Sequence, residues 1–405
     1  MSKPLNQTSP IDDPLSPENI HARFRQISAP GTGRKAYQLT LGEKFAQALY
    51  YFSPLFTEDG RWLVYNQHDV EGDVISHTCW IALDILTGKQ HKLAEVAQAS
   101  GFIHDGESAT LNPVRRELIY NTGRTYRTVH IETGEDRHLF DIPPQRKAQV
   151  QNCVSPCGRY FFYISHDAEQ WRIIKNEGKR PMTDVHIMRY DLDSGEQHLV
   201  LRLNAFCKHI IAYGPRHLCL SYDHLPVEHM LLLTDYEGGW YTALRTEIIP
   251  ENHTCHYNVS RQGLHYEAGG GSIPALGGIT CPRTHRRMEF PTPLMKGRHV
   301  AAVPDGTRWM TDGLEPAGRV LFSLTDLPSN TPPVWQQLSG PWPTYGTGQK
   351  SHGHPRVTPC GRWVLLLGGD PETRTNQLFL LDIQDVPLSR GLPDFAGEAG
   401  MDFPV

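Results

Sequence analysis

The sequence predicts an all-β protein, a seven-bladed β-propeller whose ring is closed by an N-terminal strand. Three observations lead to this prediction. The 405-residue chain is rich in Gly (36) and Pro (31) and contains few long stretches of helical periodicity. One hairpin signature recurs along the chain, and a second signature follows several of its copies. Together they define a unit of about 40 to 55 residues, the length of a four-stranded propeller blade.

The hairpin signature is a turn followed by alternating apolar residues. Its clearest copies are FTEDGRWLVY (56–65), VSPCGRYFFY (154–163) and VTPCGRWVLL (357–366). Weaker copies cover 112–120, 215–222, 260–266 and 304–310. The Gly of the turn tolerates a positive φ, which a tight reversal between antiparallel strands requires. Each copy therefore predicts two paired strands.

The second signature is an apolar run that ends in an acidic residue before a turn. It reads WIALDILTG (80–88), VHIETG (129–134), IMRYDLDSG (187–195) and LFLLDI (378–383). With it, each unit has four strands, and the blade cores are expected at 51–95, 101–142, 149–203, 207–247, 253–293, 298–338 and 352–385. The last unit lacks a fourth strand, which the strand-like segment 34–40 supplies by closing the ring. We expect an N-terminal arm (1–30), a propeller (31–387) and a C-terminal tail (388–405).

The charge and the cysteines limit the possible partners. A formal net charge of −5 gives no basic field for nucleic acid or an anionic membrane. No 18-residue apolar stretch and no secretory leader pattern occurs. The eight Cys form no C-x-x-C pair, which favours reduced thiols. We therefore expect a cytoplasmic protein with neither nucleic-acid nor membrane partners, and the sequence does not predict its oligomeric state.

The segment QKSHGHP (349–355) holds one amide and two imidazoles within six residues, at Gln349, His352 and His354. Side chains two residues apart on an extended chain project to the same side, so the two rings can reach one ion. Imidazole binds Zn, Mn, Fe, Co or Ni, and the Gln oxygen favours a harder ion such as Mn. The segment is a candidate metal site, although paired histidines also occur in ordinary surface turns.

The repeat places further histidines at an equivalent position of other blades. The position seven residues before each turn glycine is occupied by His256, His299, His354 and Gln151, and alignment of the fourth unit puts His209 there within one residue. The innermost strands of a propeller line its central channel, so these side chains converge at one end of the axis. Such a cluster can hold a divalent cation, or its members can simply bind channel water.

These residues resemble those of the oligogalacturonate lyases, the seven-bladed propellers of polysaccharide lyase family 22. The similarity extends from YYF (50–52) through the last blade. The resemblance implies a manganese ion held by Gln349, His352 and His354 together with His256. It also implies that His209, in CKH (207–209), is the base that removes the substrate proton.

The resemblance is incomplete at the arginine. The family's catalytic arginine is expected near 184–186, where this chain has none, so Arg180 is the nearest candidate and Arg189 the second. His299 lies outside the ligand set of the family, and for it we expect a substrate contact or a structural role.

The resemblance implies β-elimination on short, 4-linked oligogalacturonides. A divalent metal on the C6 carboxylate acidifies the C5 proton, a neutral imidazole removes that proton, and departure of O4 leaves a 4,5-unsaturated uronate that opens to 5-keto-4-deoxyuronate. The partner is then a small acidic oligosaccharide. Two alternatives stay open: a lyase or isomerase for another uronate-containing oligosaccharide, and a propeller that binds other proteins without catalysis.

Overall fold

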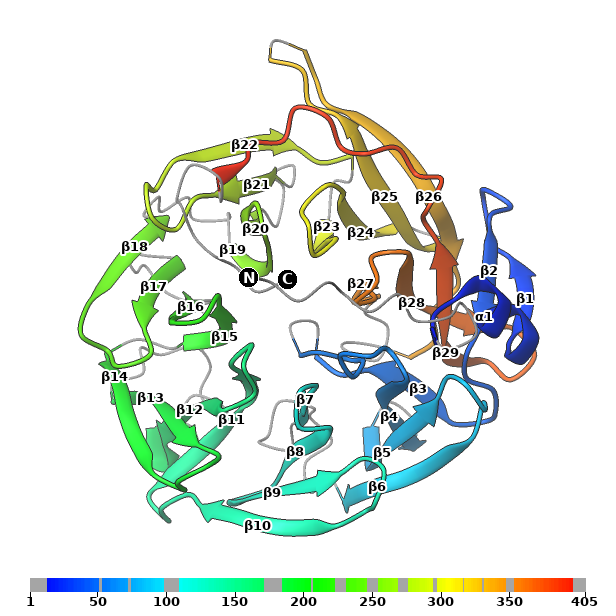
Figure 1. Cartoon of the computed structure of the whole chain (residues 1–405). Coiled ribbons are helices and arrows are strands. Elements are labelled where there is room, and N and C mark those ends of the chain that lie inside the picture. The colour runs from blue at the N-terminus through cyan, green and yellow to red at the C-terminus, as the bar shows by residue number, and fades with distance from the viewer. Residues whose placement is uncertain are drawn as a thin grey trace, which may run out of the picture.

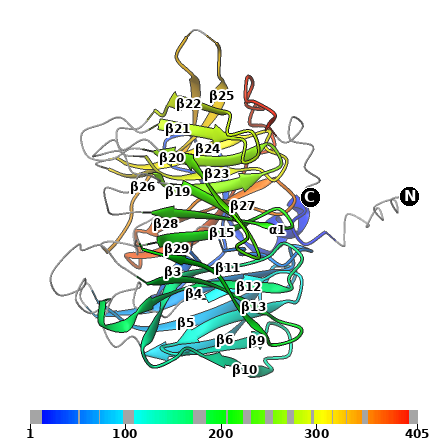
Figure 2. The ribbon, with the colours of Figure 1, turned by 90° about the vertical axis from the view of Figure 1, so that its left-hand side faces the viewer.

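The structure is a computed structural model, and it confirms a seven-bladed β-propeller (Figure 1). It describes residues 13–50, 53–71, 74–97, 109–170, 184–204, 207–222, 231–245, 254–268, 276–293, 297–315, 317–329, 331–346 and 353–395. The sheets stand around a central channel, and the innermost strands of neighbouring blades run side by side along its axis (Figure 2). Residues at equivalent positions of these strands therefore meet at the same level of the channel.

Six of the blades are four-stranded antiparallel meanders in the described residues, each with its first strand innermost. Blades 1 to 3 consist of β3 (Phe45–Ala48), β4 (Trp62–Glu71), β5 (Val74–Asp84) and β6 (Gln90–Ala97); β7 (Ala109–Asn112), β8 (Glu117–Thr122), β9 (Thr125–His130) and β10 (Asp136–Asp141); and β11 (Arg146–Val154), β12 (Tyr160–Asp167), β13 (Val185–Asp191) and β14 (Gln197–Leu203). Blades 4 to 6 consist of β15 (Cys207–Tyr213), β16 (His217–Tyr222), β17 (Leu231–Asp235) and β18 (Tyr241–Arg245); β19 (Thr254–Ser260), β20 (Gly263–Ala268), β21 (Leu276–Thr280) and β22 (Arg287–Pro291); and β23 (Gly297–Ala302), β24 (Trp309–Glu315), β25 (Gly318–Asp326) and β26 (Val334–Trp342).

Blade 7 joins the two ends of the described chain. Its sheet has the order β1-β2-β29-β28-β27, built from β1 (Arg25–Ser28), β2 (Lys35–Gln38), β27 (Arg356–Val357), β28 (Trp363–Asp370) and β29 (Thr375–Asp382). Tyr37 of β2 faces Leu380 of β29 in the antiparallel register. The N-terminal strand thus supplies the strand that the last unit lacks, as the sequence predicts.

Segments outside the repeats pack against the ring. Helix α1 (Pro17–Arg23) is capped by Ser16 and lies beside blade 7, and the Leu15 carbonyl accepts a 2.7 Å hydrogen bond from the Trp363 indole (Figure 1). At the other end, Ser389 Oγ donates to the Leu324 carbonyl, and the buried ring of Phe395 joins the core of blades 5 and 6. These contacts fasten both ends of the described chain to the sheets of blades 5, 6 and 7.

The turn of the hairpin signature has the same geometry wherever the sequence copy is clear. Gly60, Gly158 and Gly361 have φ of 70°, 73° and 71°. The Ser or Thr that begins each turn accepts a hydrogen bond from the first amide of the next strand, as Thr57 does from Trp62 at 3.1 Å. The positive φ explains why the sequence keeps Gly at this position.

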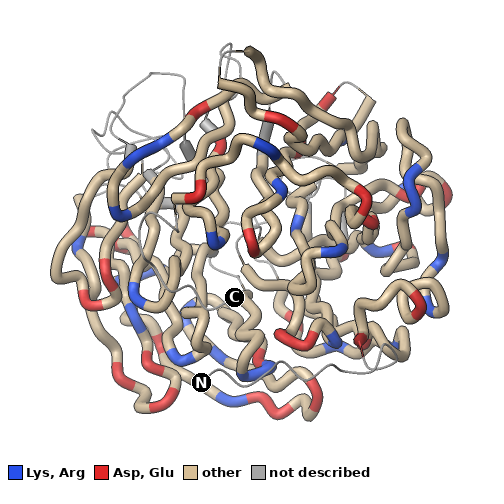
Figure 3. Tube along the Cα trace, turned by 45° about the horizontal axis from the view of Figure 1, so that its top comes forward, with Lys and Arg blue, Asp and Glu red and all other residues tan. Residues whose placement is uncertain are grey.

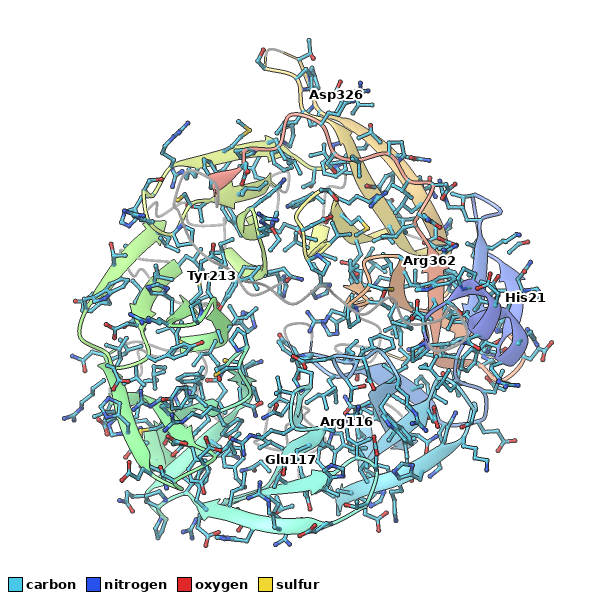
Figure 4. All side chains as sticks on the ribbon, in the orientation of Figure 1. His21, Arg116, Glu117, Tyr213, Asp326 and Arg362 are labelled. Atoms are coloured by element: carbon cyan, nitrogen blue, oxygen red, sulfur yellow. The ribbon has the colours of Figure 1, made fainter. Side chains whose placement is uncertain are left out.

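The two sequence signatures are joined by an ion pair in three blades. The Arg after the turn glycine contacts the Asp of the second signature: Arg61–Asp84 at 3.1 Å, Arg159–Asp191 at 2.6 Å and Arg362–Asp382 at 2.8 Å (Arg362 is labelled in Figure 4). Each guanidinium also lies over the aromatic ring that follows it, within 5.1 to 5.5 Å. The pairing explains why the two signatures recur together.

The surface carries both signs of charge. Lys and Arg are interspersed with Asp and Glu in the view of Figure 3, in agreement with the small net charge. Among the described residues, no helix is long and apolar enough to cross a membrane.

Candidate metal and catalytic site

Five aromatic side chains from five blades form a closed ring at the end of the channel where β15, β19 and β23 begin. In order around the ring they are Tyr50, His209, His256, His299 and His354. Successive centroids are 5.7, 5.8, 4.5 and 4.3 Å apart, and His354 returns to Tyr50 at 5.5 Å. The four histidines that the sequence places at the repeat position therefore converge in space, whereas Gln151, also placed there, bonds to Gln149.

A register shift precedes three of the four histidines. β15 shifts relative to β16 between Cys207 and His209, β19 shifts relative to β20 just before His256, and β23 shifts relative to β24 just before His299. Each shift inserts one extra residue into the inner strand, which is a β-bulge. Bulges redirect the following side chain and are common beside active sites. Here they set the level at which the imidazoles enter the channel.

His209 is held at both ring nitrogens. The Tyr50 hydroxyl lies 3.0 Å from Nε2, and Ser221 Oγ, on the neighbouring strand, lies 3.1 Å from Nδ1. His209 is fully buried. The phenol of Tyr50 is a better donor than the hydroxyl of Ser221, which can also accept. The two contacts therefore favour a neutral His209 ring with its hydrogen on Nδ1 and its lone pair on Nε2. A ring of this form can accept a proton at Nε2.

His299 is held by an acid. Its Nδ1 lies 3.0 Å from Oδ1 of Asp312, which is its cross-strand partner on β24. Arg319 Nη1 lies 3.8 Å from the other carboxylate oxygen. All three side chains are buried, with 0 to 3 % of the residue exposed. This places a charged pair directly behind the ring of imidazoles.

His256 and His354 complete the ring from blades 5 and 7. His256 is half-buried and stands opposite Glu267 of β20, a buried acid on the same face of the sheet. His354 is buried, has a positive φ of 43° and lies two residues before the start of β27. Both rings contact His299, so imidazoles from three consecutive blades lie next to one another here.

The predicted site residues divide into two groups. The structure brings His209, His256 and His354 together in the ring. Arg180, Gln349 and His352 lie outside the described residues. Their roles stay predictions.

The arginines near the expected position have other contacts. Arg189, the second candidate, bonds to Glu237 and to the Tyr236 carbonyl, which lie in blade 4 away from the ring. Arg146, at the first position of the inner strand β11, is buried and bonds to Asp184 at 2.6 Å. Burial lowers the pKa of Arg146, and the Asp184 charge opposes that shift. Asp184 lies within the segment where the sequence leads us to expect an arginine.

Several residues of the site were missed by sequence reasoning. Tyr50 falls within the YYF segment, but its phenol gives no motif, and Ser221 and Asp312 become partners only through the bulged register. The neighbouring strand could have been searched for polar residues opposite each histidine. The one-residue shift, however, cannot be read from the hydrophobic pattern.

A cavity of about 310 Å³ continues the channel beyond the ring. Residues of all seven blades line it, and they are mainly apolar or prolines, such as Ile211, Val259 and Pro359. Ile211 follows His209 by two residues on β15, so the cavity begins just past the imidazoles. The lining therefore changes from imidazoles at the ring to mainly apolar side chains in the cavity.

A second group of possible metal ligands lies in blade 1. His77, Cys79 and Glu95 have ligand atoms within 4.8 Å of one another. Lys92 Nζ, however, lies 2.7 Å from Glu95 Oε2, and burial together with the Glu95 charge raises the pKa of the Cys79 thiol. A lysine cation and a protonated thiol both oppose a metal ion. These two features argue against a metal ion at the blade 1 group.

The fold and the ring together define a propeller with nitrogen donors gathered at one end of its channel. Two solved oligogalacturonate lyases share the fold. One, in complex with manganese, is 18% identical with a TM-score of 0.72, and the match covers 89% of this chain and 96% of that chain. The other, from Vibrio parahaemolyticus, is 17% identical with a TM-score of 0.71 and coverage of 89% and 97%. A hydrazine synthase from Kuenenia stuttgartiensis is 11% identical with a TM-score of 0.52 and coverage of 82% and 96%.

These comparisons establish the architecture. The chain has the fold of the oligogalacturonate lyases, as the sequence resemblance predicts. No model of a known protein family matches the chain, and no curated protein matches it.

Proposed function

We propose that the chain is a metal-dependent lyase that cleaves short oligogalacturonides by β-elimination. The observation that carries the proposal is the closed ring in which His209, the predicted base, lies beside His256 and across from His354, two predicted metal ligands. The likeness in fold to an oligogalacturonate lyase in complex with manganese supports it. The substrate is then a small acidic oligosaccharide bound at this end of the channel.

The donor set fits a divalent metal. His256, His299 and His354 form consecutive contacts at the channel end, with centroids 4.5 and 4.3 Å apart, and imidazole is a common ligand for first-row divalent ions. His352 and Gln349 are the proposed ligands from the adjoining segment. When bound, a divalent ion such as Mn²⁺ supplies positive charge for the C6 carboxylate and so acidifies the C5 proton.

His209 is the proposed base. Its neutral form has the lone pair on Nε2, and the Tyr50 hydroxyl marks the direction of that lone pair. A substrate that displaces the Tyr50 contact presents its C5 proton to this nitrogen. The C5–H electrons then form the C4–C5 double bond as the C4–O4 bond breaks. The departing O4 takes up a proton from water, and the charged His209 later returns the C5 proton to solvent. Ser221 keeps Nδ1 in place when the ring becomes charged.

An arginine neutralises the acidic substrate in this proposal, because a planar guanidinium pairs with carboxylates through two hydrogen bonds. Arg180 is the residue proposed for this role. The released 4,5-unsaturated uronate opens to 5-keto-4-deoxyuronate. We place the reaction in the cytoplasm, a proposal that the free thiols of the described cysteines support.

A panel of uronides incubated with the Mn²⁺-loaded protein tests the proposal through the ultraviolet absorbance of the unsaturated product. We expect cleavage of short oligogalacturonides, loss of that cleavage with retained metal in His209→Ala, and loss of metal in His354→Ala. Cleavage of a different uronide instead would favour the alternative substrate. Protein that binds no metal and forms no product would contradict the proposal and favour an interaction propeller.

A further inference from the structure

We infer that His299 is an additional ligand of the metal and that Asp312 positions it, an inference that rests on the metal-dependent function proposed above. The sequence leads us to expect only a substrate contact or a structural role for His299. Its place in the ring argues for ligation. It lies between His256 and His354, and its two centroid distances of 4.5 and 4.3 Å are the shortest around the ring.

The Asp312 contact fixes which nitrogen of His299 can bind a metal. A carboxylate can only accept, so the hydrogen lies on Nδ1 and the lone pair lies on Nε2. Histidine ligands of metals usually donate their second nitrogen to a carboxylate in this way, which orients the ring and raises its basicity. Arg319, 3.8 Å from the other oxygen, provides a positive charge beside the buried acid.

Gly353 connects this pair to the predicted metal segment. A Cβ on Gly353 would lie 2.3 Å from Oδ2 of Asp312, so a larger residue could not occupy this position without a shift. The glycine between His352 and His354 therefore allows the carboxylate of blade 6 to pack against the metal segment of blade 7. This contact gives a physical reason for the Gly of H-G-H and links Asp312 to the site.

A third imidazole from the channel wall changes the expected metal preference. With His256, His299 and His354 the described donors are all nitrogen, which favours Zn, Co or Ni more than the Gln oxygen alone would. We therefore expect the loss of His299 to weaken Zn²⁺ binding more than Mn²⁺ binding.

Metal affinity of the full chain tests the inference. His299→Ala and Asp312→Asn are compared with wild type for Mn²⁺ and Zn²⁺ affinity by calorimetry, for bound metal after dialysis, and for imidazole nitrogen couplings by pulsed electron paramagnetic resonance of the Mn²⁺ protein. We expect each variant to bind about 10- to 100-fold more weakly. We also expect His299→Ala to lose one nitrogen coupling and the double variant to bind no more weakly than His299→Ala.

Two control variants separate ligation from other causes. His265→Gln removes another buried imidazole, which contacts Ser260 outside the ring, and should leave affinity unchanged. His77→Ala removes the blade 1 group and should also leave it unchanged. If His299→Ala does not fold, as judged by circular dichroism, the metal affinity of Asp312→Asn alone tests the inference.

The outcomes distinguish the inference from the proposed function. Wild-type affinity and wild-type nitrogen couplings in a folded His299→Ala protein would overturn the inference while the lyase activity stands. Unchanged metal affinity in Asp312→Asn would also overturn the inference. Wild-type protein that binds no metal would overturn both.

Discussion

The hydroxyl of Tyr50 lies 3.0 Å from Nε2 of His209, although the two residues are 159 positions apart in the chain. The contact joins the segment after β3 in blade 1 to the inner strand of blade 4 across the channel. It closes the ring of aromatic side chains and occupies the nitrogen that the proposed reaction uses. Tyr50 therefore helps to orient the proposed base, and as a donor to Nε2 it favours the neutral imidazole.

The first prediction concerns this contact. In Tyr50→Phe the neutral imidazole loses its donor, so the pKa of the base should rise and the acid limb of the pH–rate profile should move to higher pH. We expect the shift in kcat/KM, which reports the free enzyme, and a fall in kcat of less than ~100-fold, the low end for a positioned acid–base group, because substrate displaces the Tyr50 contact. Kinetics from pH 5 to 9 would show it. Tyr65→Phe, which removes a hydroxyl bonded to Gln90 away from the ring, is the control; equal profiles for the two variants would contradict the role.

The second prediction concerns Gly353. Its φ is outside the left-handed region, so Gly353→Ala tests only the space beside Asp312, where a Cβ would lie 2.3 Å from Oδ2. We expect a loss of about 1 to 3 kcal/mol of unfolding free energy, as for other overpacked sites, and weaker metal binding. Gly239→Ala is a matched control, because its Cβ would lie 3.3 Å from the Asp235 carboxylate. Denaturant unfolding and calorimetry measure both effects, and the inference fails for this residue if Gly353→Ala behaves as Gly239→Ala does.

Much of the fold was predictable because the repeat is strong. The turn glycines, the alternating strands and the Arg and Asp of the two signatures are local features, and local features are visible in one sequence. The closing strand was predictable because the last unit lacks a partner for Leu380 and its neighbours, which β2 provides. The sequence places the start of blade 1 at residue 51, but the structure places it at Phe45. Strand β3 ends at Ala48, eight residues before the hairpin signature begins at Phe56.

The site was predictable only in part. His209, His256 and His354 could be aligned because they share a position in the repeat. Tyr50, Ser221 and Asp312 could not, because their roles depend on side chains that meet across blades or across a bulged register. His299 was aligned correctly, but its contacts with Asp312 and with both neighbouring imidazoles appear only in three dimensions.

The third prediction compares two turn glycines. Gly158 and Gly361 have nearly the same φ, 73° and 71°, so Ala at either position should cost about 1 kcal/mol or somewhat more from backbone strain. A Cβ on Gly158 would also lie 2.7 Å from Val114 Cβ and 2.9 Å from Asn112 Oδ1, whereas one on Gly361 meets nothing within 4 Å. We expect Gly158→Ala to be the more destabilised by about 1 to 3 kcal/mol. Denaturant midpoints measure the difference, and equal midpoints would contradict it.

The fourth prediction concerns acid stability. Burial, together with the charge of Arg146, lowers the pKa of His166 to about 3. In the unfolded chain the ring titrates near ~6.5, so between these values the unfolded state binds a proton that the folded state does not. The unfolding free energy should therefore decrease as pH falls from 6.5, by up to about 1.4 kcal/mol per pH unit for this ring. His166→Gln keeps a side chain that can bond to Gln149 and should remove this contribution. Denaturant unfolding at pH 7, 6 and 5, above the titration range of most carboxylates, measures the slope. His166→Gln should show a flatter decrease than wild type, and parallel decreases would mean that His166 titrates normally in the folded protein.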